Sequence, residues 1–224
     1  MSWDVGAWVI ATVNSVLGTL IQAHGTQTFT SNGTFTVPAG VTKIWITACA
    51  GGQGGTRHRS SGSYYQGGKG GDGGECIIRE PYAVSAGQAI SITVGNGGSV
   101  GSNGTPTIIG NLVTLRGGGT ATGLVGAGVG GEGGLYYSDN PSNRGAEYGL
   151  DGARGNGGTV ADRSVRSSPN GGGGGGSYGC GGNGADSSKE ASQFPPGYGG
   201  GGGGGSYNYT GASAGGDGIV IIEW

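Results

Sequence analysis

Cysteine and histidine, which supply most transition-metal sites, are scarce in this chain. Its 224 residues contain three cysteines and two histidines. An odd cysteine count does not indicate a disulfide framework, and without a Cys-x-x-Cys pair no zinc motif is present. We therefore expect reduced, structural thiols at Cys49, Cys76 and Cys180, no metal, and synthesis in a cytoplasm. Cys49 and Cys76 lie in strand-like runs and could lie close together.

Grouped catalytic residues are also missing. His24 and His58 are the only imidazoles. Lys69 is followed by Gly70 instead of Ser or Thr, so there is no Walker A loop. The acidic residues of the glycine-rich half are scattered, and their spacing gives no reason to pair any two as catalytic carboxylates. The sequence predicts a protein that is not an enzyme and that needs no cofactor.

Excess charge of either sign is absent. Lys and Arg number 11 against 13 Asp and Glu, for a net charge of −2. This balance gives no electrostatic reason to expect nucleic acid as a partner. No Lys or Arg precedes Lys43, so the basic start of a signal peptide is missing. Polar residues such as Asp4 and Asn14 also make the first apolar segment a poor membrane span, and we expect no membrane insertion.

Proline is too rare for collagen, and apolar residues are too few for an ordinary core. The chain has 7 prolines, and 33% of its residues are hydrophobic. Glycine is abundant instead: of 61 glycines, only five lie in the first 50 residues. If this chain folds, much of its interior must be backbone.

The glycines form runs that alternate with richer inserts. The runs lie near residues 67–74, 95–104, 117–134, 149–158, 171–184, 199–205 and 211–218. The inserts are residues 56–66, 135–148, 159–170, 185–198 and 206–210. Extended glycine chains of the polyproline II type have three residues per turn, and their outward N–H and C=O groups need partners when buried. Lys69 and Asp72, three residues apart between glycine pairs, fit one outward face of such a rod. The sequence predicts a bundle of polyglycine II helices.

Strands are expected before and between these runs. Thr28 to Val37 has the pattern of a hairpin with an Asn-Gly turn at Asn32 and Gly33. Further apolar runs of strand type are residues 43–50, 76–79, 90–94, 107–109, 112–116 and 218–224. The last run is apolar on both faces, so we expect the C-terminus to close the sheet. The fold class is mainly β and irregular: a short β-sheet plus the glycine bundle.

The first 25 residues form a separate apolar segment. Residues 3–22 fit an amphipathic helix, although frequent β-branched residues make a strand a real alternative. Such a segment must be covered by a partner, a sister chain or the body of the protein. Its expected partner-docking residues are Trp8, Val9, Val13, Val16, Leu17 and Leu20. We divide the chain into an attachment segment (1–25), a β-rich scaffold with the first glycine runs (26–116), and a glycine bundle with variable loops and a closing strand (117–224).

Three stretches resemble the glycine-rich domain of bacteriophage tail and tail-fibre proteins. Residues 35–46 read Phe-Thr-Val-Pro-Ala-Gly-Val-Thr-Lys-Ile-Trp-Ile, and residues 48–55 read Ala-Cys-Ala-Gly-Gly-Gln-Gly-Gly. Residues 215–223 resemble the last residues of that domain. The resemblance covers residues 27–224. The alternation of glycine runs and inserts also resembles the tip adhesins of T-even-like phages. In those adhesins a polyglycine II bundle carries loops that contact outer-membrane proteins or surface sugars, and an N-terminal module attaches to a trimeric fibre.

The inserts are rich in tyrosine, which offers a large contact area at low entropic cost. Nine of the ten tyrosines lie in inserts or glycine runs. Individual tyrosines could instead pack over the rods, and individual arginines could be solvated loop charges. The expected receptor-binding residues are Arg57, Arg59, Tyr64, Tyr65, Tyr136, Tyr137, Arg144, Tyr148, Arg163, Arg166, Phe194, Tyr198, Tyr207 and Tyr209.

These features predict a receptor-binding adhesin at the tip of a phage tail fibre. Residues 1–25 would attach it to a tail-fibre or tail-tip protein, and the loops would contact a bacterial outer-membrane protein or a surface glycan. The protein would be part of the virion, made in the host cytoplasm. The alternative is a structural or assembly protein, such as a fibre-tip cap or a folding helper, that leaves receptor contact to others.

Overall fold

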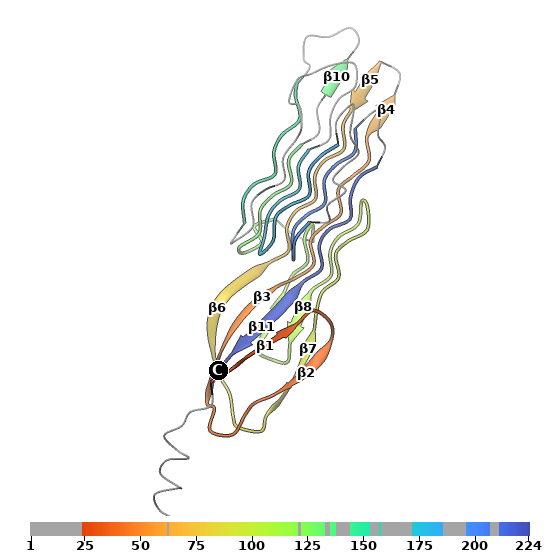
Figure 1. The fold of residues 1–224 in the computed structure, drawn as a ribbon. Helices are drawn as coiled ribbons and strands as arrows, with labels where there is room; N and C mark the ends of the chain where they lie inside the picture. Colours follow the sequence, from red (N-terminus) through yellow and green to blue (C-terminus); the bar gives the residue numbers. More distant parts are fainter. Residues whose placement is uncertain are drawn as a thin grey trace, which may run out of the picture.

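The molecule is elongated, with a β-sheet base at one end and a glycine-rich bundle that ends in a small sheet at the other (Figure 1). The computed structural model describes residues 24–61, 63–120, 122–132, 135–137, 144–152, 157, 172–185, 196–206 and 211–224. Within these residues the fold is mainly β and contains no helix, so none that could cross a membrane. The expected docking residues from Trp8 to Leu20 lie in residues 1–23, outside the described part.

Eleven strands are assigned in the described residues, in three sheets. Their bounds are β1 Thr26–Phe29, β2 Gly33–Thr36, β3 Lys43–Cys49, β4 Arg59–Ser61, β5 Tyr64–Gln66, β6 Cys76–Ala83, β7 Ala89–Thr93, β8 Thr107–Ile109, β9 Val113–Leu115, β10 Leu135–Tyr137 and β11 Ile219–Glu223. Two sheets of four strands, β1-β11-β3-β6 and β2-β7-β8-β9, form the base. The third sheet, β10-β5-β4, lies at the far end of the bundle.

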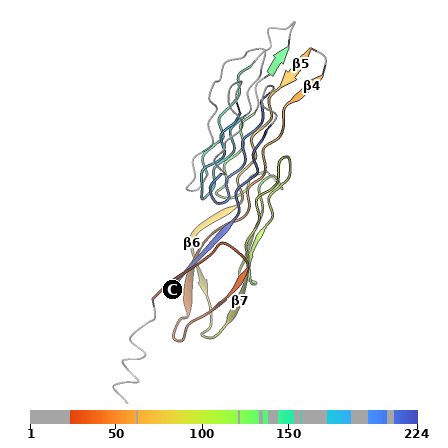
Figure 2. The same cartoon turned by 45° about the vertical axis from the view of Figure 1, so that its right-hand side comes forward.

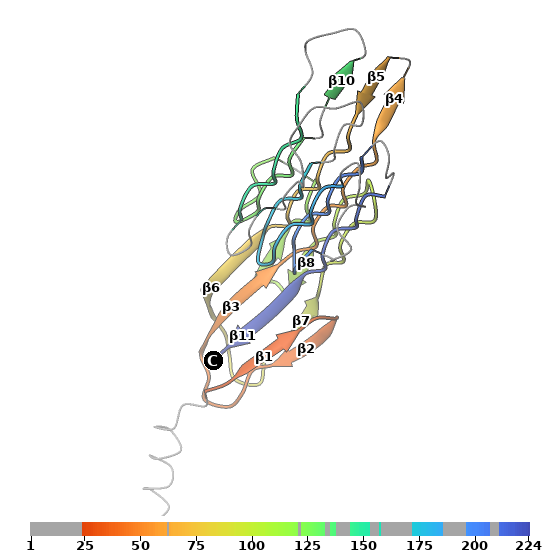
Figure 3. The same ribbon diagram turned by 45° about the horizontal axis from the view of Figure 1, so that its top comes forward.

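The two base sheets bury one apolar core between them. Strand β7 alternates exposed and buried positions, as its sequence predicts, and turns Ile90 and Ile92 inward. They meet Ile44 and Ile46 of β3 and Phe35 of β2 in a single hydrophobic cluster. Figures 2 and 3 show from two further directions that the base and the bundle follow one long axis.

The expected hairpin over residues 28–37 is wrong. Strand β1 pairs with β11 in one sheet, whereas β2 pairs with β7 in the other. The segment between them crosses from sheet to sheet, and Gly33 does not have the positive φ that the expected turn requires. The Asn32 side chain accepts a hydrogen bond from the Val94 N–H instead. Burial of β1 and β2 in opposite layers of the core outweighs the local turn signal.

The C-terminal strand β11 lies inside its sheet. It pairs with β1 on one side and β3 on the other, so it does not close the sheet at an edge. Its apolar run suits this place, because Val220 and Ile222 are fully buried and Ile221 is half-buried. The sequence thus indicated the burial of this strand correctly but not its neighbours.

The expectation of three reduced thiols is wrong as well. The pairing of β3 with β6 places Cys49 directly opposite Cys76, with Cα atoms 4.2 Å apart, and the two form a disulfide. Cys180 is the free, exposed cysteine of the described residues. Cross-linking residues 27 apart in sequence stabilises a fold by about 3.5 kcal/mol in the chain-entropy account. The bond joins the two strands at the point where both continue into glycine runs.

The glycine runs pack side by side and are joined by backbone hydrogen bonds. In residues 51–56, successive N–H groups donate to three different neighbouring segments, and every third donor returns to the same neighbour. Gly52 and Gly55 donate to Gly216 and Ser213, whereas Gln53 and Thr56 donate to Asp72 and Lys69. These runs are therefore bonded to one another and are not free linkers.

Six segments surround residues 51–56. The run donates to residues 102–105, 213–216 and 69–72, and it accepts hydrogen bonds from residues 98–101, Gly118 and residues 202–205. A run with neighbours on all sides satisfies its buried backbone groups without belonging to a sheet.

Side chains are excluded from the contact faces of these runs. A Cβ atom built on Gly71 would overlap the carbonyl oxygen of Gln53, and one on Gly175 would overlap that of Gly128. The larger residues take every third position. Lys69 and Asp72 share one face, as predicted, and that face lies against residues 128–132: Lys69 pairs with Glu132 at 3.3 Å, and Asp72 accepts from the Gly130 N–H.

A buried carboxylate helps to join the base to the bundle. Glu75, just before β6, is 8% exposed and receives hydrogen bonds from the Arg116 guanidinium at 3.1 and 3.2 Å and from the Arg116 N–H at 2.9 Å. Burial raises the pKa of Glu75, but the hydrogen bonds and the positive charge of Arg116 outweigh it, so the pKa lies below its ordinary 4.5. Charged Glu75 therefore stabilises the native state.

We expect Gly175→Ala to lower the free energy of unfolding by about 2 kcal/mol or more, because its methyl group forces two backbones apart. The measurement is chemical unfolding of the full chain. Gly211→Ala is the matched control, since a Cβ there meets nothing within 4 Å. Equal stability of the two variants would contradict the close packing of the runs.

Glu75→Gln should reduce stability by about 1–3 kcal/mol at pH 7, through the loss of charged hydrogen bonds. The pKa of Glu75 is lowered on folding, so its contribution is present above 4.5 and is lost as the pH falls through the folded-state pKa. The difference between wild type and variant should therefore shrink from pH 6 to pH 3 in urea unfolding. Glu80→Gln, on the exposed part of β6, is the control. A difference that does not vary with pH would refute the role of the carboxylate.

Candidate functional site

The far end of the bundle carries a small antiparallel sheet built from two predicted inserts. Strands β4 and β5 come from residues 56–66, and β10 comes from residues 135–148. In register, Ser60 lies opposite Tyr65 and Tyr65 opposite Tyr136. This sheet, which we call the tip sheet (β4, β5 and β10), is separated from the base by the length of the bundle (Figure 1).

The face of the tip sheet that carries Arg59 and Gln66 adjoins a pocket. Directly paired residues of antiparallel strands point to the same face, which places Arg59 beside Gln66. Tyr64 lies two residues before Gln66 on the same face, and its hydroxyl donates a hydrogen bond of 2.6 Å to Gln66 Oε1. This bond occupies the Gln66 oxygen, and no bond from the Gln66 amide nitrogen to another described residue is present.

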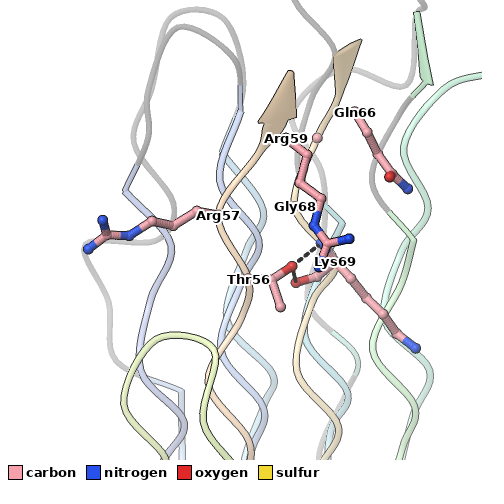
Figure 4. A pocket seen from close by; sticks show the side chains of 7 residues that line it. Thr56, Arg57, Arg59, Gln66, Gly68 and Lys69 are labelled. Carbon is pink, nitrogen blue, oxygen red and sulfur yellow. Dashed lines mark hydrogen bonds between the residues drawn. The ribbon is translucent and has the colours of Figure 1, made fainter. Parts of the chain in front are cut away.

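A pocket of about 220 Å³ lies where the tip sheet meets the bundle. It is lined by residues of β4, β5 and the glycine run that follows: Thr56, Arg57, Arg59, Gln66, Gly67, Gly68 and Lys69. Figure 4 shows the Arg59 side chain pointing toward Thr56 and Lys69, whereas Arg57 points away from them. Gly67 and Gly68 contribute backbone to the lining, and none of the described lining residues has an apolar side chain.

The pocket lining is positively charged. The described lining residues include Arg57, Arg59 and Lys69 and no Asp or Glu. Lys69 is paired with Glu132 at 3.3 Å, so part of its charge is offset. Among the described residues no carboxylate lies within ion-pair distance of Arg57 or Arg59.

An ionic cluster includes Lys69 of the pocket and connects its run to residues of two neighbouring segments. Arg144, which bridges to Leu135 of β10, lies 3.5 Å from Glu147 and 3.9 Å from Glu132. Glu132 thus connects Arg144 with Lys69 of the pocket. Partly exposed pairs of this kind each contribute little to stability.

The structure brings part of the predicted contact set together. Arg57, Arg59, Tyr64, Tyr65, Arg144 and the backbone of Tyr136 and Tyr137 lie at or beside the tip sheet.

Two predicted tyrosines lie elsewhere. Tyr148 is on the flank of the bundle and is 44% exposed. Tyr198 is 42% exposed and precedes Gly199, where an added Cβ would lie 3.0 Å from the Cβ of Cys49 at the base end of the bundle. Outside the described residues lie Arg163, Arg166, Phe194, Tyr207 and Tyr209, and the side chains of Tyr136 and Tyr137 are likewise not described.

Sequence reasoning missed the polar lining of the pocket. Thr56, Gln66 and Lys69 were not among the expected contact residues. The Thr56 hydroxyl accepts from the Lys69 N–H at 2.7 Å and donates to the Lys69 carbonyl at 3.3 Å, so it joins two antiparallel segments. The threefold position of Lys69 between glycine pairs was a usable signal, but its neighbour across the bundle was not readable from spacing.

The site offers hydrogen bonding and positive charge. In the described part of the chain, no three His, Cys, Asp or Glu side chains are grouped as metal ligands. The arrangement can therefore hold a polar or negatively charged group by donors already in place.

Comparison with known families agrees with the composition of the chain. Residues 27–224 match the family described as a glycine-rich domain, and the chain therefore belongs to the glycine-rich domain family. None of the curated proteins matches it. The family match confirms the glycine-rich domain expected from the sequence, while the link to phage tails stays a prediction.

Proposed function

We propose that this member of the glycine-rich domain family is a receptor-binding adhesin at the tip of a bacteriophage tail fibre. The observation that supports it most is the arrangement of the two ends of the molecule. Two of the tyrosine- and arginine-bearing inserts form a sheet at one pole, while the C-terminus, bonded to Gly25, lies at the other (Figure 1). Attachment through the base would leave the tip sheet facing outward, toward an outer-membrane protein or a surface glycan of the host.

The base holds the chain in place at Gly25, where the N-terminal segment ends. Gly25 and Trp224 exchange two backbone hydrogen bonds of 3.0 Å, and the Trp224 ring packs 5.2 Å from that of Phe35. A chain entering at Gly25 therefore enters through a fixed point of the core. This arrangement suits residues 1–25 as the link to a tail-fibre or tail-tip protein.

In this proposal the glycine runs are polyglycine II helices. The threefold return of the donors in residues 51–56 and the six surrounding segments are what three residues per turn and lateral bonding would produce. Such a bundle is stiff because every run is bonded to several others. A stiff scaffold lowers the entropy lost on binding by the loops that it carries.

The Cys49–Cys76 disulfide also suits a virion protein. Disulfides persist in oxidising surroundings, and a tail-fibre tip acts outside the cell.

The alternative is a structural or assembly protein without direct receptor contact. One observation favours it: Val125, Val129 and Leu150 are 62%, 49% and 61% exposed. The Leu150 N–H donates to the Val129 carbonyl, so these two residues are neighbours on the flank of the bundle. Exposed apolar residues in contact are a common feature of protein interfaces. A cap or folding helper would use this flank, and its tip sheet would be dispensable for attachment to cells.

The double variant Tyr64→Ser, Tyr65→Ser should weaken binding of the purified full chain to host cells about tenfold or more, because buried tyrosines dominate interface energy. Binding is measured with labelled protein on cells of the bacterium that the phage infects. Tyr198→Ser is the matched control at an exposed tyrosine of the base end. Unchanged binding by the double variant, or no binding by the wild type, would refute the adhesin, and the protein's absence from purified virions would do the same.

A further inference from the structure

The pocket beside the tip sheet offers a ligand hydrogen-bond donors. The Thr56 hydroxyl is already engaged with the Lys69 backbone, and Gln66 Oε1 accepts from Tyr64. Within the described residues, the groups that remain for a ligand are the Arg59 guanidinium, the Gln66 amide nitrogen and part of the Lys69 ammonium. These are all hydrogen-bond donors, and two of them carry positive charge.

We propose that this pocket binds one anionic group of a saccharide, a carboxylate or a phosphate. Arg59 points into the pocket and would form the charge-assisted hydrogen bonds, in the paired geometry that guanidinium groups make with oxyanions. Lys69 lies at its side, held there by Glu132 at 3.3 Å. Arg57 points away and adds positive potential at the rim.

The size and the lining favour a sugar over an apolar ligand. The volume of about 220 Å³ is below the roughly 300–1,000 Å³ of drug-sized sites, so it admits one small unit. The walls are polar side chains and the floor is the backbone of Gly67 and Gly68. Hydroxyl groups around an anionic substituent would find polar partners on each side. The neighbouring Tyr64 presents an aromatic ring on the same face of the tip sheet.

This inference rests on the proposed function, because it names the chemistry that the tip would recognise on a host surface. The two can nevertheless fail separately. An adhesin could bind a neutral receptor through its tyrosines and leave this pocket empty. Conversely, the pocket could bind an acidic sugar in a protein that does not attach to cells.

The test is calorimetric titration of the full chain with a disaccharide that ends in glucuronic acid. The same disaccharide as its methyl ester removes the charge, and a sugar 6-phosphate replaces the carboxylate by a phosphate. We expect binding of one or both anionic sugars, which identifies the source of the charge, and at least tenfold weaker binding of the ester. Wild-type affinity should fall as salt increases, since screening weakens the ion pair.

Arg59→Gln should weaken the anionic sugar about tenfold or more, through the loss of charge-assisted hydrogen bonds. Lys43→Gln makes the same charge change at the exposed first residue of β3 in the base and should leave the affinity unchanged. Equal binding of the ester, equal loss in both variants, absence of binding to either anionic sugar, or tighter binding of a tetra-aspartate peptide would overturn the proposal. Retained cell binding alongside such a result would leave the adhesin function intact.

Discussion

The sideways hydrogen bond between bare glycine backbones is the interaction on which the whole molecule depends. Each run in the bundle can bond to neighbours on several sides only because no Cβ lies between the chains, as Gly71 and Gly175 show. Glycine loses much conformational entropy on folding, so a single run of this kind would not be ordered. Many runs bonded to one another offset that loss, which makes the bundle cooperative and leaves only every third position for other side chains.

The base and the tip sheet both follow from this constraint. In the described residues the large apolar cluster lies in the two-layered base, which supplies the hydrophobic burial, and the disulfide and Glu75 join it to the glycine runs. At the opposite end the runs are connected by inserts that need not pack closely. There the chain has room for tyrosine, arginine and polar side chains. Side chains suited to recognition therefore lie at the end of the bundle, where close backbone packing no longer requires glycine.

The sequence predicted those features that depend on local pattern. The alternation over residues 90–94 indicated a half-buried strand, and the spacing of Lys69 and Asp72 indicated a common face. Features that depend on which segments become neighbours were missed. The Asn32-Gly33 pair looked like a hairpin turn, but β1 and β2 enter different sheets. The disulfide needed the register of β3 against β6, and the pocket needed Arg59 brought beside Lys69, neither of which is encoded by spacing along the chain.

The central claim is that the glycine runs form a cooperatively bonded scaffold that fixes the tip relative to the base. Native-state hydrogen exchange of the backbone amides tests it most directly. The N–H groups of Gly52, Gly71 and Gly175 donate across runs, and we expect these amides to exchange as slowly as those of the buried strand β11. Exchange of these glycine amides at the rate of an unstructured chain, while β11 stays protected, would contradict the account.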